Sequence, residues 1–399
     1  MTTTINNEHK KLNVPNSTDR GNVIRNVPAL RFPEFSGEWK REILNDVCTF
    51  HNGRAYKQNE LLSDGKYRVL RVGNFFTNDS WYYSDLELDD EKVAVNGDLL
   101  YAWSASFGPR FWTGEKVIYH YHIWKIDSFQ QVSKEFLFYF LERDTEKIKN
   151  EVQGGTMVHI TKGDMEKREI LYPSILEQSK IARLLSLLDE RIATQNKIIE
   201  DLKKLKSAII EKLYSDIQGK EYSYRQLFEV INERNKQMEY SNILAASQEK
   251  GMVNRDELNL DIQFERSNID IYKIVRKGDY VIHLRSFQGG FAFSNMTGVC
   301  SPAYTILRPS TLLEYGYLSY YFKSYRFIKS LIIVTYGIRD GRSISVEEWL
   351  NLKISIPSKE HQLHILKVLR SFDLKIENEE TYASCLSNQK QYLLRQMFI

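Results

Sequence analysis

Side chains that could contact nucleic acid gather in loop-forming stretches of sequence in both halves of the chain. Arginine and lysine can neutralise phosphates or pair with guanine, glutamine can pair with adenine, serine can bind either, and nearby glycines let the backbone approach closely. The candidate DNA contacts are Arg54, Lys57, Ser104, Ser106, Arg110 and Lys162 in the first half, and Arg285, Ser286, Gln288, Arg339, Arg342 and Ser343 in the second. Any one such loop is more often a solvated surface turn, but recurrence in both halves favours binding.

The common catalytic signatures are missing from the sequence. The chain contains no GxxxxGK[ST] phosphate loop, no GxGxxG motif and no GxSxG nucleophile motif. The Phe-Gln-Gly-Gly stretch at 287–290 is more typical of a turn than of a cofactor loop. His120 and His122 would share one face of a strand, but no third ligand accompanies them, so no metal site is expected. These absences favour a binding protein over an enzyme.

Charge and cysteine content set further limits. The chain has 55 Lys and Arg against 52 Asp and Glu, so its net charge of +3 does not by itself indicate a polyanionic partner. Its three cysteines, Cys48, Cys300 and Cys385, are far apart and form no CxxC pair, which fits a reducing cytoplasm better than a disulfide framework. Residues 1–26 are polar and are expected to form a mobile tail, and no apolar run is long enough for a signal peptide or a membrane span.

The sequence contains an internal repeat, which determines how the chain is divided. Six positions recur in identical or similar form at a constant offset of 184 residues: Pro173 and Pro357, Gln178 and Gln362, Ile181 and Ile365, Leu185 and Leu369, Asp189 and Asp373, Ile192 and Ile376. A fainter match, at an offset of 181, relates Asn-Gly-Asp-Leu-Leu at 96–100 to Lys-Gly-Asp-Tyr-Val at 277–281. Each half is therefore a divergent region followed by a similar tail.

The tails are predicted to be long helices. After each proline, apolar residues recur in steps of three and four, as in the seam of a coiled coil. About 40 residues at 1.5 Å per residue would make a rod of roughly 60 Å. A single stripe of this kind more often packs on its own domain, but two matching stripes favour helices that pack on each other, and antiparallel packing would relate the halves by an approximate two-fold axis. Polar exceptions in the seam, which could fix the register, are Gln195 and either Glu379 or Glu380.

The divergent regions are predicted to be α+β domains. Strand-forming patterns occur at 67–72, 98–103, 117–126, 279–284 and 303–307, and helical patterns occur at 134–150 and 316–330. The expected fold class is α+β, with two globular domains joined by two long helices packed as an antiparallel coiled coil in a tandem repeat. The expected boundaries are a tail at 1–26, a domain at 27–172, a helix at 173–217, a domain at 218–356 and a helix at 357–399.

The tails carry a resemblance to a known family. The sequence P-S-I-L-E-Q-S-K-I-A-R-L-L-S-L-L-D-E-R-I from residue 173, its echo P-S-K-E-H-Q-L-H-I-L-K-V-L-R-S-F-D-L-K-I from residue 357, and the opening V-P-A-L-R-F-P-E-F-S-G-E-W from residue 27 resemble the specificity subunit of type I restriction-modification systems. The resemblance covers Val27 to the C-terminus and is specific in the tails. The second tail departs from it, with His361 where the first has Glu177, which is expected to change only a local contact.

The resemblance implies two target recognition domains, each reading one half of a bipartite, asymmetric sequence in double-stranded DNA. The paired helices would set the gap and dock two methyltransferase subunits, and through them nuclease subunits that translocate DNA. The chain itself would be non-catalytic and would hold no cofactor, because S-adenosylmethionine, ATP and Mg²⁺ would bind to the partner subunits. Candidate interface residues on the helices are Ile181, Leu185, Leu188, Ile192, Ile365, Leu369, Phe372 and Ile376.

Two functions of other classes compete with this interpretation. A coiled-coil scaffold whose globular domains bind proteins would show no salt-dependent affinity for duplex DNA, whereas phosphate contacts require affinity to fall with salt. A methyltransferase or nuclease acting alone would turn over substrate with S-adenosylmethionine or Mg²⁺, and the missing catalytic motifs disfavour it.

Overall fold

The computed structural model describes residues 26–75, 78–104, 107–151, 160–215, 217–247, 250–258, 266–283, 290–336 and 343–399. The chain forms two compact units. Unit 1 consists of Met1–Arg191 and Leu386–Ile399, and unit 2 consists of Ile192–Cys385. Each unit therefore combines one α/β region with stretches of both long helices.

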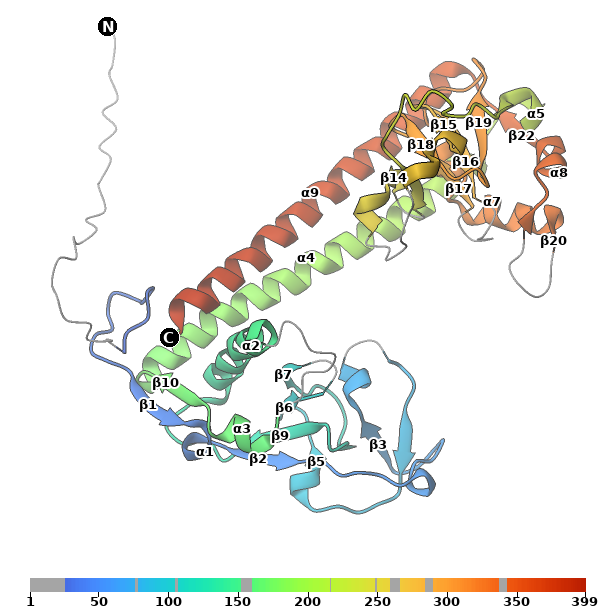
Figure 1. Cartoon of the computed structure of the whole chain (residues 1–399). Coiled ribbons are helices and arrows are strands. Elements are labelled where there is room, and N and C mark those ends of the chain that lie inside the picture. The colour runs from blue at the N-terminus through green and yellow to red at the C-terminus, as the bar shows by residue number, and fades with distance from the viewer. Residues whose placement is uncertain are drawn as a thin grey trace, which may run out of the picture. The chain divides into compact units, whose positions relative to one another are not determined.

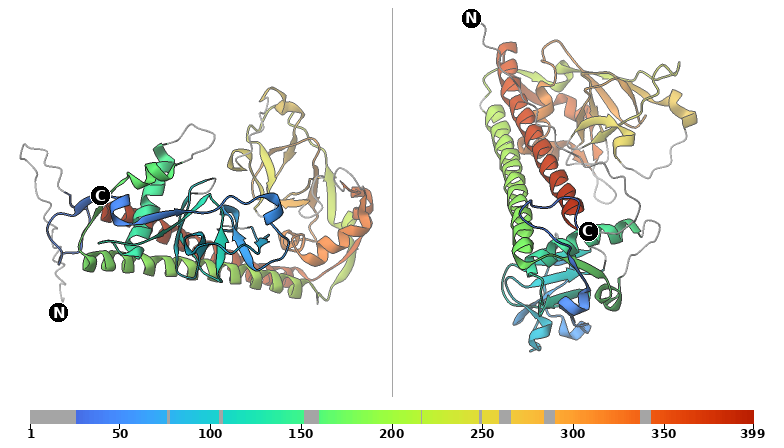
Figure 2. Two further views of the ribbon diagram at one scale, coloured as in Figure 1. Left: turned by 90° about the horizontal axis from the view of Figure 1, so that it is seen from below. Right: turned by 90° about the vertical axis from the view of Figure 1, so that its left-hand side faces the viewer.

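The two long helices are α4 (Ile175–Ser215) and α9 (Lys359–Met397), and each begins two residues after a proline (Figure 1). Within unit 2 the amide of Gln195 on α4 donates to the backbone oxygen of Glu379 on α9 at 3.3 Å, and further along α4 Lys206 pairs with Asp373. Since the partners on α9 run in the opposite order, the helices pack antiparallel. Within unit 1 the C-terminal end of α9 lies beside the start of α4 (Figure 2). The expected fold class is confirmed.

The apolar stripes of the two long helices are part of the hydrophobic cores of the units. Ile181 and Leu185 belong to the hydrophobic core of unit 1, and Ile365 and Leu369 belong to the core of unit 2. Because these four side chains are buried inside the chain, they offer no surface to another protein, which corrects their assignment to a subunit interface. Ile376 is also buried, whereas the other three candidates keep partial exposure: Leu188, Ile192 and Phe372.

Unit 1 places its α/β region around an antiparallel sheet of order β2-β9-β6-β7, with a mixed sheet β4-β3-β8-β5 and the pair β1-β10. Its core includes Phe50, Trp124 and Phe136. In chain order, the described elements are β1 (Lys40–Ile43), α1 (Leu44–Val47), β2 (Thr49–Asn52), η1 (Gln58–Glu60), β3 (Tyr67–Leu70), η2 (Val72–Phe75), β4 (Tyr82–Ser84), η3 (Asp90–Lys92), β5 (Val93–Ala94), β6 (Leu99–Ala102), β7 (Gly108–Phe111), β8 (Val117–Tyr119), β9 (Ile123–Asp127), α2 (Lys134–Glu151), α3 (Lys162–Glu166) and β10 (Glu169–Tyr172).

Unit 2 repeats this plan with the sheet β12-β19-β16-β17 and the pair β11-β22, and its pair β15-β18 matches β5-β8 of unit 1 at an offset of 181 residues. It also contains the pairs β13-β14 and β20-β21. The described elements are β11 (Lys220–Ser223), α5 (Tyr224–Leu227), β12 (Phe228–Ile231), β13 (Leu244–Ser247), β14 (Gly251–Asn254), η4 (Arg255–Leu258), η5 (Arg266–Ile271), β15 (Lys273–Val275), β16 (Tyr280–Ile282), β17 (Phe291–Phe293), β18 (Gly298–Cys300), β19 (Thr305–Pro309), α6 (Tyr317–Tyr321), α7 (Tyr325–Ser330), η6 (Leu331–Val334), β20 (Thr335–Tyr336), β21 (Ser343–Ile344), α8 (Val346–Asn351) and β22 (Lys353–Ile356).

Two predicted elements are interrupted in the structure. The strand expected at 117–126 is two strands, β8 and β9, separated by a turn. His120 and His122 lie between these strands and therefore do not share one face of a single strand. The helix expected at 316–330 is divided into α6 and α7, because the Ser324 hydroxyl accepts a hydrogen bond from the Phe327 amide at 3.2 Å and caps a new helix.

A buried glutamine fixes the start of α4 in unit 1. The side-chain amide of Gln178 donates to the backbone oxygens of Pro173 at 2.9 Å and Gln131 at 2.8 Å, and its oxygen accepts from the Ser133 amide at 2.8 Å. Three backbone groups that would otherwise be unpaired are thereby satisfied, and the helix is tied to the segment before α2.

Unit 2 repeats the same contacts at the offset of the sequence repeat. Gln362 donates to the backbone oxygens of Pro357 at 3.1 Å and Leu312 at 3.0 Å, and accepts from the Glu314 amide at 2.8 Å. The neighbouring position differs, since Glu177 is buried and makes two hydrogen bonds with Arg31, at 2.8 and 2.7 Å, whereas His361 is exposed.

In each unit, the C-terminal end of one long helix completes a hydrophobic core that also contains the start of the other long helix. In unit 1, Phe398 contacts the rings of Phe136 and Trp39, with centroids 5.1 and 6.5 Å apart. At the corresponding place in unit 2, Tyr214 packs on Tyr317, with centroids 5.4 Å apart. Each α/β region therefore depends on residues from both halves of the sequence.

Replacing either buried glutamine is expected to destabilise its own unit. Gln178→Ala or Gln362→Ala leaves buried backbone groups without partners, which costs about 1 to 3 kcal/mol of unfolding free energy. Chemical denaturation measures this loss, and Gln389→Ala, at an exposed position of α9, is the control. Equal stabilities for all three variants would contradict the assignment.

Candidate nucleic-acid interface

The structure describes part of the predicted set of contacts. Arg54, Lys57, Ser104, Arg110 and Lys162 lie in described parts of unit 1, and Ser343 is the first residue of β21. The remaining predictions lie outside the described residues: Ser106, Arg285, Ser286, Gln288, Arg339 and Arg342. The geometry of the site is therefore that of unit 1 and of the strands that border the loops of unit 2.

The first predicted loop packs against the turn between β8 and β9. The Arg54 amide donates to the backbone oxygen of Tyr119 at 3.0 Å, and the Tyr121 amide donates to the backbone oxygen of Arg54 at 3.0 Å. A Cβ atom on Gly53 would lie 2.2 Å from the His120 oxygen. Only glycine allows this approach, so the residue that precedes Arg54 is fixed by backbone packing.

Arg54 orders its own loop. Its Nη2 lies 2.7 Å from Oε1 of Glu60, and its guanidinium lies over the Tyr56 ring, 5.5 Å from the centroid. Glu60 also accepts from the Lys57 amide at 2.8 Å, which joins Arg54 to the start of η1. The Arg54 side chain is about one-third exposed, and part of its charge is used in contacts within the protein. The exposed Lys57 presents its charge to solvent.

A cluster of aromatic and histidine rings, not foreseen from the sequence, joins this loop to the second one. Trp103, next to Ser104, lies 5.0 Å from His122, and His122 lies 4.9 Å from His120, measured between ring centroids. The Tyr56 ring stacks on His120 at 6.4 Å. Burial lowers the pKa of His120 to about 4, so its ring is neutral at pH 7. Flat, uncharged rings of this kind can stack on bases.

The same cluster does not make a metal site. Within the described residues no group of three His, Cys, Asp or Glu side chains is arranged to hold a metal ion. His120 and His122 instead make ring contacts with each other and with their neighbours, Tyr121 among them.

The other predicted residues of unit 1 differ in how they are placed. Ser104 is buried, which corrects its assignment as a base contact. Arg110 is exposed on β7 and lines a cavity of about 410 Å³. Lys162 starts α3 and lies 3.2 Å from Glu166, so its charge is partly neutralised there.

Strand pairing defines where the predicted loops of unit 2 begin and end. β16 pairs with β17, and the His283 amide donates to the Gly290 oxygen at 2.8 Å, so residues 284–289 connect the two strands of a hairpin. β20 pairs with β21, so residues 337–342 connect a second hairpin. The β16–β17 hairpin corresponds to β6–β7 in unit 1, and the predicted loop of each unit connects the two strands.

An aspartate supports each of these corresponding hairpins, and Asp279 is buried whereas Asp98 is partly exposed. Asp279 accepts from the Arg276 amide at 2.9 Å and pairs with Arg308 on β19 through two contacts of 3.0 Å. In unit 1, Asp98 accepts from the Val95 amide at 2.9 Å and pairs with Lys125 on β9 at 3.2 Å. The faint Gly-Asp repeat in the sequence is therefore a conserved support for a hairpin whose tip differs between units.

Comparison with known proteins finds similarity to type I restriction-modification specificity subunits. Residues 36–204 match the family described as "Type I restriction modification DNA specificity domain". This matched segment is similar to that specificity domain. A specificity subunit of the type I restriction enzyme MjaVIII from Methanocaldococcus jannaschii is 27% identical over 196 residues, which are 48% of this chain and 45% of that protein. A putative type I specificity subunit of Mycoplasma pneumoniae is 24% identical over 181 residues, 45% of this chain and 46% of that protein. The matches thus span less than half the length of these relatives.

Solved structures of similar fold cover most of the chain. A type I restriction-modification S subunit from M. genitalium has a TM-score of 0.53 at 16% identity and covers 94% of this chain and 99% of its own length. A chain from a study of complex assembly and conformational transition of the type I R-M system has a TM-score of 0.58 at 16% identity, covering 90% and 97%. None of the described helices combines the length and apolar composition that crossing a membrane requires.

His120 is expected to titrate near pH 4. Its pKa is lower in the folded chain than the ordinary value of 6.5, so below pH 6.5 the unfolded chain binds a proton that the folded chain does not. The stability that the neutral ring contributes is then lost as pH falls from about 6.5 towards 4. Proton NMR of the imidazole measures the titration, with His120→Phe to assign the signal. A midpoint near 6.5 would contradict the burial of this ring.

Proposed function

We propose that the chain is the non-catalytic DNA-recognition subunit of a type I restriction-modification complex and acts in the cytoplasm, with each unit reading one half of a bipartite, asymmetric target. The observation that carries this proposal is one scaffold present twice with different hairpin tips. The supports are repeated, as with Asp98 and Asp279, whereas the connecting residues differ. Two similar scaffolds whose connecting residues differ are suited to reading two half-sites of different sequence.

The chemistry of the tips supports direct reading of bases and phosphates. Residues 284–289 contain Arg285, Ser286 and Gln288, and residues 337–342 contain Arg339 and Arg342. Arginine can bind guanine through two hydrogen bonds, and glutamine can do the same with adenine. In unit 1 the exposed Lys57 and Arg110 are suited to phosphate contacts, and the ring cluster around His120 offers stacking surfaces.

The helix pair suits a spacer between the two readers. α4 has 41 residues and contributes to the cores of both units, and a helix of that length extends about 60 Å. Two modules that engage one face of duplex DNA do so at centres one helical turn, about 34 Å, or a multiple of it apart. In this proposal the helices set the number of base pairs between the half-sites.

Exposed leucines on the helices are suited to docking partner subunits in place of the buried seam. In unit 1, α4 exposes Leu176 (76%) and Leu187 (44%), and in unit 2, α9 exposes Leu363 (50%) and Leu374 (60%). Each pair is eleven residues, or about three turns, apart, so both leucines lie on one side of the helix. The proposed partners are two methyltransferase subunits, and nuclease and translocase subunits through them. S-adenosylmethionine, ATP and Mg²⁺ would bind those partners.

Single arginine replacements test which half-site each unit reads. Arg339→Ala is expected to weaken binding to duplexes that carry the second half-site by about 1 to 3 kcal/mol, with the first half-site preference unchanged. Arg110→Ala should affect only the first. Affinity is measured at several salt concentrations, and Arg225→Ala is the control because Arg225 pairs with Glu347 at 2.6 Å on α8. Wild-type binding that is weak and independent of salt would favour the protein-binding scaffold instead.

Polar replacement of the exposed leucines tests partner docking. Leu187→Ser or Leu374→Ser should weaken assembly with the methyltransferase subunits by at least about 1 kcal/mol, since buried apolar anchors carry most of the energy of an interface. Size-exclusion chromatography with light scattering measures the assembly. Val230→Ser, at an exposed position of β12, is the control. Unchanged assembly in both leucine variants would exclude this surface.

A further inference from the structure

Three side chains from three elements meet where the α/β region of unit 1 joins the helix pair. The Tyr139 hydroxyl on α2 donates to Oδ2 of Asp189 on α4 at 2.9 Å, and Nζ of Lys390 on α9 lies 2.6 Å from Oδ1 of the same aspartate. We refer to Tyr139, Asp189 and Lys390 as the unit 1 junction triad. One carboxylate thereby joins the recognition region to both helices.

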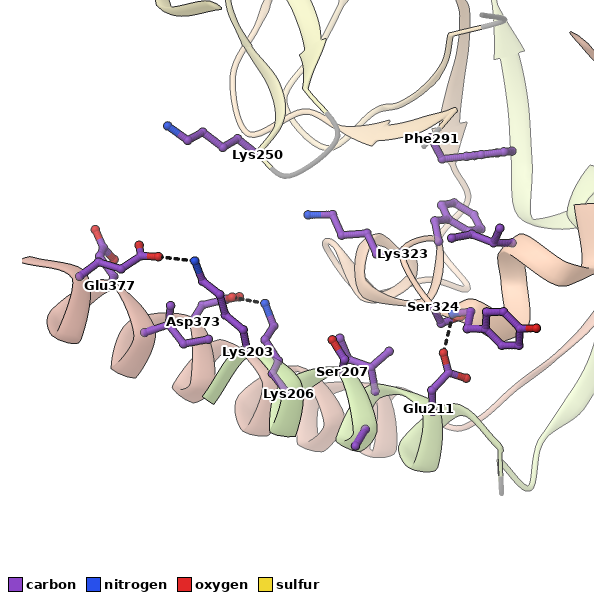
Figure 3. Close-up of a pocket in the computed structure, with 17 residues that line it drawn as sticks. Lys203, Lys206, Ser207, Glu211, Lys250, Phe291, Lys323, Ser324, Asp373 and Glu377 are labelled. Atoms are coloured by element: carbon purple, nitrogen blue, oxygen red, sulfur yellow. Dashed lines mark hydrogen bonds and ion pairs between the residues drawn. The ribbon is translucent and has the colours of Figure 1, made fainter. Parts of the chain in front are cut away.

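Unit 2 contains the same arrangement, with the origins of the helices exchanged. The Tyr320 hydroxyl on α6 donates to Oδ2 of Asp373 on α9 at 2.5 Å, and Lys206 on α4 pairs with Oδ1 of Asp373. Tyr320, Asp373 and Lys206 form the unit 2 junction triad. Figure 3 shows the Asp373 and Lys206 pair in the wall of a cavity of about 940 Å³. The aspartates and lysines of the two triads are related by the 184-residue offset and the tyrosines by 181.

The lysines of the triads are largely shielded from water, whereas the side chains of Asp189 and Asp373 are 38% and 47% exposed. The Lys390 side chain is 10% exposed and that of Lys206 is 21% exposed. Burial raises the pKa of both tyrosines, so their hydroxyls remain protonated donors at physiological pH. Ion pairs with a partly exposed partner contribute little to the free energy of unfolding, and replacing even buried ion pairs by well-packed apolar residues is often neutral or stabilising. Stability alone therefore does not explain why both copies keep charges here.

Directional contacts explain the charges better. Apolar packing tolerates small rotations of one element on another, whereas ionic hydrogen bonds are short and depend on geometry. A carboxylate held by a donor on each side fixes the recognition region and both helices in one orientation.

We propose that the two junction triads are positioning residues that set the orientation of each recognition region on the helix pair and thereby limit the spacer lengths accepted between the half-sites. This inference rests on the proposed function. It assigns specificity for spacing to residues that do not contact DNA.

The triads differ at one corresponding position, which predicts unequal effects. In unit 1, Lys390 also lies 2.7 Å from Glu142, and burial raises the pKa of that carboxyl group. In unit 2 the residue at the 181-residue offset is Lys323, which lines the same cavity as Lys206 and Asp373. Loss of Lys390 leaves two carboxylates without their cation, whereas loss of Lys206 leaves one, so the unit 1 triad should be the more sensitive.

The test measures spacer preference. The target is first defined by selecting wild-type binders from random duplexes, and affinities are then measured for duplexes with the native spacer and with spacers one or two base pairs shorter or longer. In Lys390→Met and Lys206→Met the preference for the native spacer should fall by about three- to tenfold, the range of one typical hydrogen bond, because the aspartates are partly exposed to solvent. Half-site sequences should be unchanged, and Lys390→Met should have the larger effect.

Matched variants separate positioning from folding. Lys203→Met removes another lysine paired across the helices, at 2.6 Å from Glu380 but without a tyrosine, and should keep the native preference. Tyr139→Phe and Tyr320→Phe remove one hydroxyl each and serve if a lysine variant unfolds. Folded triad variants with wild-type spacer preference would overturn the inference, whereas wild-type protein that selects no DNA would overturn the proposed function.

Discussion

Each recognition region completes its hydrophobic core with the ends of two helices that come from different halves of the chain. Phe398 closes the core of unit 1 and Tyr214 that of unit 2. Without these helix ends each core would expose large aromatic surfaces to water, so neither α/β region forms a complete hydrophobic core from its own segment of sequence. The antiparallel helix pair is thus required by both units, and the placement of the candidate DNA contacts that the structure describes depends on it.

This constraint explains what the repeat preserves. Gln178 and Gln362 satisfy the same backbone groups, Asp98 and Asp279 support the same hairpin, and the residues that tie helix to recognition region recur at the same offsets. The strand connections differ in sequence between the two halves, which changes their side-chain chemistry while these supporting contacts are kept. Such a division lets recognition diverge while the scaffold stays constant, as is usual for loops on a rigid framework.

The repeat and the helical periodicity were enough to predict the fold, since Pro173 and Pro357 mark two helices with matching seams. The site was harder to predict. Arg54 pairs with Glu60 across a loop that follows no periodic rule, and the turn at 120–122 was hidden because strand-forming residues continue through it. The stripe containing Ile181 and Ile365 indicated burial, but a periodic pattern cannot tell a partner subunit from the chain's own core. Lys390 and Asp189 are too far apart in sequence for any local pattern to relate them.

The most direct test of the central claim is to map methylated adenines in a genome with and without this gene, in cells that contain the partner methyltransferase. Two recognition units on one helix pair predict a single motif made of two different half-sites separated by a gap of fixed length, absent when the gene is deleted. A continuous motif, a palindrome with identical halves, or a pattern unaffected by the deletion would contradict the account.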